Sequence, residues 1–185
     1  VCYDPCDKKS TTSMLDSLLK SSTARYKFVA VHEPIIPVNH RCWHVYRKDS
    51  NRREQLLETI ARNSAIVLCA HLHKYSVVSR NTPWGPIVQI LVNSVVRNLN
   101  RQSEPKIFTT YGQSMFEGHE SWEPESLDQR RQWIESETPC VTFYRYADIP
   151  GYATIDIDGD ELILNYYYGA ETTPIDTVNI SKINQ

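Results

Sequence analysis

The sequence has no long apolar run, no excess of basic charge and no even number of cysteines, and each absence excludes a class of protein. No stretch reaches the roughly 20 apolar residues of a membrane-spanning helix, and no signal-peptide pattern opens the chain. The formal charge of −2, with lysine and arginine scattered, gives no electrostatic reason to expect nucleic-acid binding. We therefore expect a soluble protein, whose compartment stays open because the chain begins at Val1 rather than Met.

The five cysteines cannot all pair within the chain, because their number is odd. The spacing of Cys2 and Cys6 fits a disulfide, half of a metal clip or two free thiols, and the sequence leaves these alternatives open. Cys69 lies in an apolar stretch, where a cysteine is most simply a small buried hydrophobe. A fully paired disulfide framework within this chain is therefore excluded.

What the sequence does contain is the ordinary material of a globular core. Its 185 residues are 41% hydrophobic and 23% charged, and no internal repeat or low-complexity segment interrupts them. Periodicity and turn residues predict helices over 12–22, 51–63 and 124–136, and strands over 26–31, 64–69, 75–79, 87–96, 140–146, 152–156 and 161–168. Asp158-Gly159, between two of these strands, is typical of a tight hairpin. The order of elements predicts an α/β protein.

Histidines follow two of the predicted strands. The strand over 26–31 is followed by His32, and the strand over 64–69 is followed by His71 and His73. A helix between these strands predicts a β-α-β step, so the strands are expected to be parallel neighbours. In an extended backbone, side chains two residues apart leave one face, about 7 Å from each other. Because open α/β sheets bind ligands at the carboxyl ends of their strands, we expect the three imidazoles to share one site.

Two segments carry a resemblance to a known family. Tyr26–Pro34, and then Ala65–His73 after a helix, resemble the second half of the catalytic domain of calcineurin-like metallophosphoesterases. In that family one strand ends in a metal-ligand histidine and a later strand ends in Gly-His-x-His. Gly151–Gly159 is similar to the closing hairpin of many members, and the resemblance is good over 24–100 and weaker over 140–168. It implies a partial metallophosphoesterase β-sandwich, a sheet with flanking helices and a C-terminal β-hairpin region.

The resemblance also implies a division of the chain into three parts. Residues 1–100 would be the C-terminal half of a metallophosphoesterase-like domain. Residues 101–139 would be an irregular and helical insertion, and residues 140–185 would supply closing strands of the same domain.

Carried over position by position, the resemblance implies that His32 and His71 ligate one metal and His73 the other. The centre would hold two divalent ions, and imidazole ligands leave Mn, Fe, Zn and Ni open as their identity. The family's earlier motifs, Asp-x-His, Gly-Asp and Gly-Asn-His, do not precede His32, and Ala70 stands where the family has Gly. We therefore expect the C-terminal part of a longer phosphoesterase that lacks the N-terminal half of its domain and is inactive in isolation. A degenerate, non-catalytic relative is the alternative.

The predicted loop over 38–50 leaves the sheet next to His32. Its side chains Arg41, His44 and Arg47 are candidates to line a substrate cleft, where an arginine would contact a phosphate of the phosphorylated substrate. The class of substrate and the oligomeric state do not follow from the sequence.

Two rival interpretations remain. A non-catalytic binding module would use the tyrosine-rich C-terminal strands, among them Tyr166–Tyr168, as its working face, although tyrosines in a sheet more often serve packing. A mononuclear site made of His32, His71 and His73 would instead resemble a zinc hydratase or hydrolase site.

Overall fold

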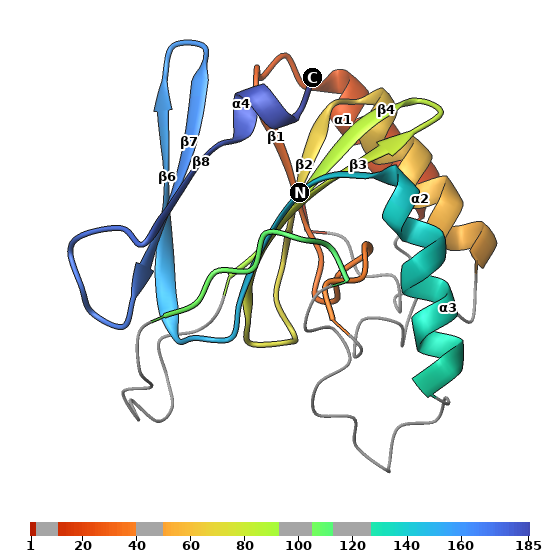
Figure 1. Cartoon of the computed structure of the whole chain (residues 1–185). Coiled ribbons are helices and arrows are strands. Elements are labelled where there is room, and N and C mark those ends of the chain that lie inside the picture. Colours follow the sequence, from red (N-terminus) through yellow and green to blue (C-terminus); the bar gives the residue numbers. More distant parts are fainter. Residues whose placement is uncertain (3–10, 40–49, 93–104, 113–126) are drawn as a thin grey trace.

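The computed structural model describes residues 1–2, 11–39, 50–92, 105–112 and 127–185 (Figure 1). These residues form an α/β fold with a mixed five-stranded sheet, in the order β1-β2-β4-β3-β5, and an antiparallel three-stranded sheet, in the order β6-β7-β8. Figure 1 shows three layers: the small sheet, the large sheet, and helices over the outer face of the large sheet.

The elements have the following bounds. The strands are β1 (Lys27–Ala30), β2 (Ala65–Cys69), β3 (Tyr75–Thr82), β4 (Gly85–Leu91), β5 (Val141–Ala147), β6 (Gly151–Asp158), β7 (Glu161–Tyr168) and β8 (Asp176–Asn179). The helices are α1 (Thr12–Ser21), α2 (Ser50–Arg62), α3 (Leu127–Glu137), the 3-10 helix η1 (Thr138–Cys140) and α4 (Ile180–Ile183). In the described residues, no helix has both the length and the apolar character required to cross a membrane.

The N-terminal helix shows how local sequence sets an element. Thr11 caps α1, because its Oγ1 accepts a hydrogen bond from the backbone N–H of Met14 at 3.2 Å. Leu15 and Leu19, one turn apart, are both only 2% exposed and join the core. The helix predicted over 12–22 is therefore confirmed to within one residue.

The predicted β-α-β step is confirmed. β1 and β2 pair in parallel with Phe28 opposite Ile66, and α2 connects them. Alternate residues face opposite sides of the sheet: Val29 and Val67 pack under the helices, whereas Phe28 and Ile66 face the small sheet. Both strands therefore end at the same edge of the large sheet.

The two sheets pack face to face through a second apolar cluster. Leu162, Leu164 and Tyr166 of the small sheet are 0% exposed and meet the inner face of the large sheet. The ring of Tyr166 stacks on that of Tyr75 in β3, with centroids 3.9 Å apart and planes 5° from parallel. The expectation of a sheet sandwich with flanking helices is thus met at the level of layers.

Some predicted boundaries are wrong for local reasons. The β6–β7 turn consists of Gly159 and Asp160, one residue later than predicted, because Asp158 still pairs with Glu161. A φ of +54° at Gly159 suits the left-handed backbone of such a turn. The elements β8 and α4 were not predicted, because four-residue elements carry too little pattern.

Two other predicted elements extend beyond the residues that the structure describes. The strand predicted over 87–96 ends at Leu91, and 93–96 lie outside the described part. The helix predicted over 124–136 corresponds to α3, and 124–126 also lie outside it.

Candidate metal centre

Backbone hydrogen bonds continue past the ends of β1 and β2 and draw the following residues together. The N–H of Val31 donates to the carbonyl oxygen of Leu68 at 2.9 Å, and the N–H of Ala70 donates to that of His32 at 3.1 Å. The carbonyl of His32 is therefore held beside the residue that precedes His71.

His32 and His71 are in direct contact. Nε2 of His32 lies 3.0 Å from Nδ1 of His71, and the ring centroids are 4.9 Å apart with planes at 82°. Both residues are exposed. One ring nitrogen donates its hydrogen to the lone pair of the other, and the tautomers decide which is the donor. The structure thus brings together two of the three predicted ligands; their role as ligands stays a prediction.

The extended backbone expected through His71 and His73 is wrong. β2 ends at Cys69, and the N–H of Leu72 donates to the carbonyl oxygen of Ala70 at 2.8 Å, which closes a γ-turn around His71. His71 has a φ of +66° and His73 a φ of +53°, so both are left-handed. A γ-turn with positive φ is rare and strained. The two imidazoles consequently do not follow the alternation of a strand.

His73 does not complete a three-ligand group with the histidine pair. Among the residues that the structure describes, no three His, Cys, Asp or Glu side chains are placed to hold one metal ion. The mononuclear site of three histidines is therefore not assembled in this part of the chain. What the structure presents is a two-imidazole pair, with His73 exposed two residues beyond it.

The pair has the donor chemistry and spacing of two ligands of one ion. Neutral imidazole nitrogens bind first-row divalent metals at about 2.0–2.1 Å. Two such nitrogens on one ion lie about 2.9 Å apart when they meet it at a right angle and about 3.3 Å apart in tetrahedral coordination. The observed 3.0 Å between Nε2 of His32 and Nδ1 of His71 lies between these two spacings. The residues therefore fit half of a metal site, and further ligands are required.

An ion pair at the same edge was not anticipated. Lys74, which follows His73, pairs through Nζ with Oδ1 of Asp148, the residue after β5. The Lys74 side chain is 22% exposed and that of Asp148 is 63% exposed. The position of Lys74 directly after His71-x-His73 predicts a cation near the histidines, but no sequence pattern indicates that Asp148 is its partner.

The remaining candidates separate into two groups. Arg41, His44 and Arg47 lie outside the described residues. Of the tyrosine run, Tyr166 is 0% exposed and belongs to the core, whereas Tyr167 stacks on Tyr152 with centroids 4.7 Å apart.

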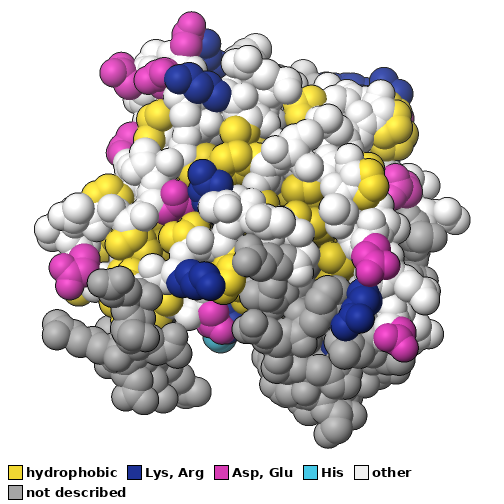
Figure 2. Space-filling model, in the orientation of Figure 1, with side chains coloured by type: hydrophobic (Ala, Val, Ile, Leu, Met, Phe, Trp, Pro, Cys, Tyr) yellow, Lys and Arg dark blue, Asp and Glu magenta, His cyan; other side chains and the backbone are white. Residues whose placement is uncertain are grey.

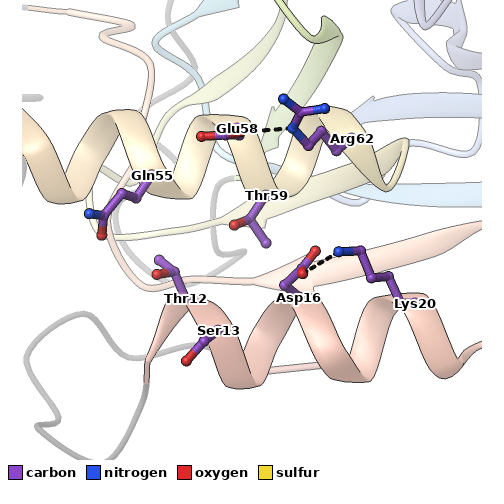
Figure 3. A pocket seen from close by; sticks show the side chains of 8 residues that line it. All are labelled: Thr12, Ser13, Asp16, Lys20, Gln55, Glu58, Thr59 and Arg62. Carbon is purple, nitrogen blue, oxygen red and sulfur yellow. Dashed lines mark hydrogen bonds and ion pairs between the residues drawn. The ribbon is translucent and has the colours of Figure 1, made fainter.

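A separate hollow of about 420 Å³ lies between α1 and α2 and contains none of these histidines. It is polar, and its facing helices each carry an ion pair, Asp16 with Lys20 and Glu58 with Arg62 (Figure 3). On the face shown in Figure 2, acidic and basic side chains are interspersed. Because its charges are already paired within each helix, the hollow does not select a ligand of one sign.

Comparisons with known proteins identify no family. No family model matches the chain, and no curated protein matches it. Among solved structures, a structure of PhoD is similar to 91% of this chain, with 14% sequence identity and a TM-score of 0.49. The match covers 31% of the PhoD chain, so this chain spans about a third of the length of that protein. The case for a function therefore depends on the residues at the sheet edge.

Proposed function

We propose that this chain forms part of a metal-dependent phosphoesterase. His32 and His71 hold one divalent ion, and His73 contributes to a second. The contact of Nε2 of His32 with Nδ1 of His71, at the carboxyl ends of two parallel strands, is the observation that carries this proposal. Strained, left-handed backbone at two of the three histidines supports it, because such strain concentrates at functional sites.

Two divalent ions held at this edge would polarise phosphoryl oxygens and lower the pKa of a bound water. The imidazoles contribute neutral lone pairs and a fixed geometry. The hydrogen bond between His32 and His71 holds their nitrogens 3.0 Å apart, and for both to bind one ion the donor nitrogen would have to give up its hydrogen. A metal-bound histidine usually donates its other N–H to a nearby acceptor, and for His32 the candidates are Glu33 or a backbone carbonyl.

The proposal includes a further set of ligands from an N-terminal half of the domain that is not part of this chain. Carboxylates complete such centres, and no group of three candidate ligands occurs in the described part. The chain alone is therefore proposed to bind metal weakly and to be inactive. The substrate is a phosphoester, and Arg41, His44 and Arg47 are proposed to line its cleft.

A zinc titration of the 185-residue chain, followed through the ¹⁵N shifts of its histidine rings, tests the ligand assignment. We expect Zn²⁺ to shift Nε2 of His32 and Nδ1 of His71 selectively. His32→Ala and His71→Ala should each abolish that response, whereas Lys20→Ala, on the exposed face of α1, should leave it unchanged. Zinc that perturbs neither nitrogen would contradict the assignment.

Turnover tests the proposed incompleteness of the site. With Mn²⁺ and an aryl phosphate, the isolated chain should show no activity above that of the His32→Ala variant. Rapid hydrolysis that depends on His32 would show that the site is complete within this chain.

A further inference from the structure

The segment that follows His32 crosses the large sheet on its helix side. Residues 33–38, which we call the crossing segment, follow β1 (orange in Figure 1) and pass Gln89 of β4 before they reach Tyr144 of β5. Ile35 and Ile36 are 1% and 0% exposed, so the segment is part of the core. At its far end, the hydroxyl of Tyr144 in β5 donates to the carbonyl oxygen of Val38 at 3.0 Å.

Gln89 in β4 binds the middle of the crossing segment. Its Oε1 accepts hydrogen bonds from the N–H groups of Ile35 at 2.7 Å and Ile36 at 2.9 Å, and its Nε2 donates to the carbonyl oxygen of Ile36 at 2.9 Å. The side chain is only 1% exposed. The partners also fix the orientation of the amide, because the reverse orientation would set its NH₂ against two N–H donors.

A buried amide in an apolar core is costly unless its hydrogen bonds are made. On the helix side of β4, Gln89 stands between Ile87 and Leu91, both 0% exposed. An aliphatic residue would complete that apolar row, so packing alone does not explain glutamine here. What the amide achieves is a fixed backbone conformation at Ile35 and Ile36.

We propose that Gln89 is a positioning residue for the histidine pair. The backbone is fixed at His32, whose carbonyl oxygen accepts a hydrogen bond from the N–H of Ala70. It is fixed again at Ile35, whose N–H donates to Gln89. Only Glu33 and Pro34 lie between these anchors, and the ring of Pro34 restricts its own φ. The two anchors together set the direction of the His32 ring toward His71. The consequence for metal affinity rests on the proposed function.

Arg53 in α2 adds a second hold on the same segment. Its Nε donates to the carbonyl oxygen of Ile35 at 3.0 Å, and its Nη2 lies 3.0 Å from Glu137 of α3. The side chain of Arg53 is 7% exposed. Gln89 and Arg53 thus bind opposite backbone groups of Ile35, from the strand below and the helix above.

Gln89→Met tests the proposal, because methionine keeps the length of the side chain and removes its three hydrogen bonds. The ¹⁵N shifts and tautomers of His32 and His71 are measured in the metal-free chain, and Zn²⁺ affinity is measured by calorimetry. In the wild type, the ¹⁵N shifts should show the hydrogen bond between the two rings, a pattern that we call the ring signature. We expect Gln89→Met to abolish this signature and to lower the Zn²⁺ affinity about tenfold, the scale seen for residues that orient metal ligands. Gln89→Glu, which keeps the acceptor for both N–H groups, should retain more of the signature.

Ser79→Ala is the matched control. Ser79 is also a buried polar residue of the large sheet, 0% exposed, and its Oγ donates to the carbonyl oxygen of Ile183 at 2.8 Å. This variant should lose stability without changing the histidine signature, which separates positioning from a general loss of structure. If Gln89→Met is unfolded, Gln89→Leu, which removes the same three hydrogen bonds, replaces it in the comparison and should likewise abolish the signature.

The outcomes separate the two proposals. A wild-type ring signature and affinity in folded Gln89→Met would overturn the positioning role and leave the metal site intact. A wild-type chain that binds no zinc, combined with a ring signature that Gln89→Met abolishes, would overturn the metal site and leave the positioning role. A signature that Ser79→Ala disturbs equally would also overturn the positioning role.

Discussion

The two sheets differ in where they accept backbone strain. In the small sheet and its connections, the left-handed residues are Gly159 and Gly169, which adopt that conformation without a steric penalty. In the large sheet's described connections, non-glycine residues also adopt it: Ser64, His71 and His73. A sequence selected only for stability would favour glycine at such positions. Two of these three residues, His71 and His73, follow the C-terminal end of β2, where the proposed metal site would need their side chains, whereas Ser64 lies at the opposite end of that strand.

The largest effect is expected where the two sheets meet. Tyr166→Ala should lower the free energy of unfolding by about 3–5 kcal/mol, the usual range for a buried aromatic truncated to alanine. It removes the ring stacked on Tyr75 and a hydroxyl that donates to the carbonyl oxygen of Ile149 at 2.8 Å. Tyr167→Ala, on the opposite face of β7, should cost far less. Urea denaturation compares them, and equal losses would contradict the assignment of the inner face.

The next largest effect is expected at a buried carboxylate at the end of α3. Glu137 is 4% exposed and binds Arg53 at 3.0 Å and Arg80 at 2.6 Å. Burial by itself would raise its pKa, but the two guanidinium groups outweigh burial and hold the pKa below its ordinary value. Glu137→Gln removes the buried carboxylate that Arg53 and Arg80 share and should cost about 3 kcal/mol.

The lowered pKa of Glu137 also predicts a pH dependence. The folded chain binds this proton less readily than the unfolded chain, so the stabilisation is complete above the ordinary glutamate pKa. It is lost as pH falls through the lowered pKa of the folded state. Between wild type and Glu137→Gln, the difference in unfolding free energy should therefore shrink on acidification. Glu58→Gln, in an exposed pair with Arg62, serves as the control, and an unchanged difference at acid pH would contradict the prediction.

The large sheet was predictable because its signals are local and periodic. The strands before His32 and His71 are short apolar runs, and α2 between them presents Leu56, Leu57 and Ile60 on one face, each 0% exposed. Parallel pairing follows from that order, and it brings the two histidines to one edge. Sequence therefore identified the pair and its place in the fold.

The finer geometry of the edge depends on contacts that no local pattern records. The left-handed turn at His71 breaks the alternation that an extended strand would have given. In the sequence, Gln89 is a single polar residue in an apolar strand. Its hydrogen-bond partners Ile36 and Ile35 lie 53 and 54 residues away, so no local pattern predicts them. The same holds for Asp148, which is 74 residues from Lys74. Tertiary partners of this kind become visible only once the chain is folded.

The contrast between the sheets can be tested by placing a non-glycine residue at a left-handed position of the small sheet and glycine at one beside the large sheet. Gly159→Ala should lower the free energy of unfolding by about 1 kcal/mol, because alanine is disfavoured at a φ of +54°. Apart from Gly159 and its two chain neighbours, no heavy atom lies within 4 Å of the added Cβ, so the loss comes from backbone strain and not from a clash. His73→Gly should raise the free energy by up to about 1 kcal/mol, since glycine relieves strain but gains unfolded-state entropy. Thermal denaturation measures both, and a destabilised His73→Gly would show that this backbone is not strained.

The smallest effect is expected at the exposed pair beside the hollow between α1 and α2. Lys20→Ala should change the free energy of unfolding by no more than about 0.5 kcal/mol, because exposed pairs one helical turn apart contribute little. The pKa of Asp16 is lowered chiefly by its hydrogen bond from Lys20 and secondarily by that from Asn63. It should therefore rise part of the way toward its ordinary value in the variant, which carboxyl NMR titration measures. A pKa that does not move would assign the shift to Asn63, whose Nδ2 lies 2.9 Å from Oδ1 of Asp16 and ties α1 to the end of α2.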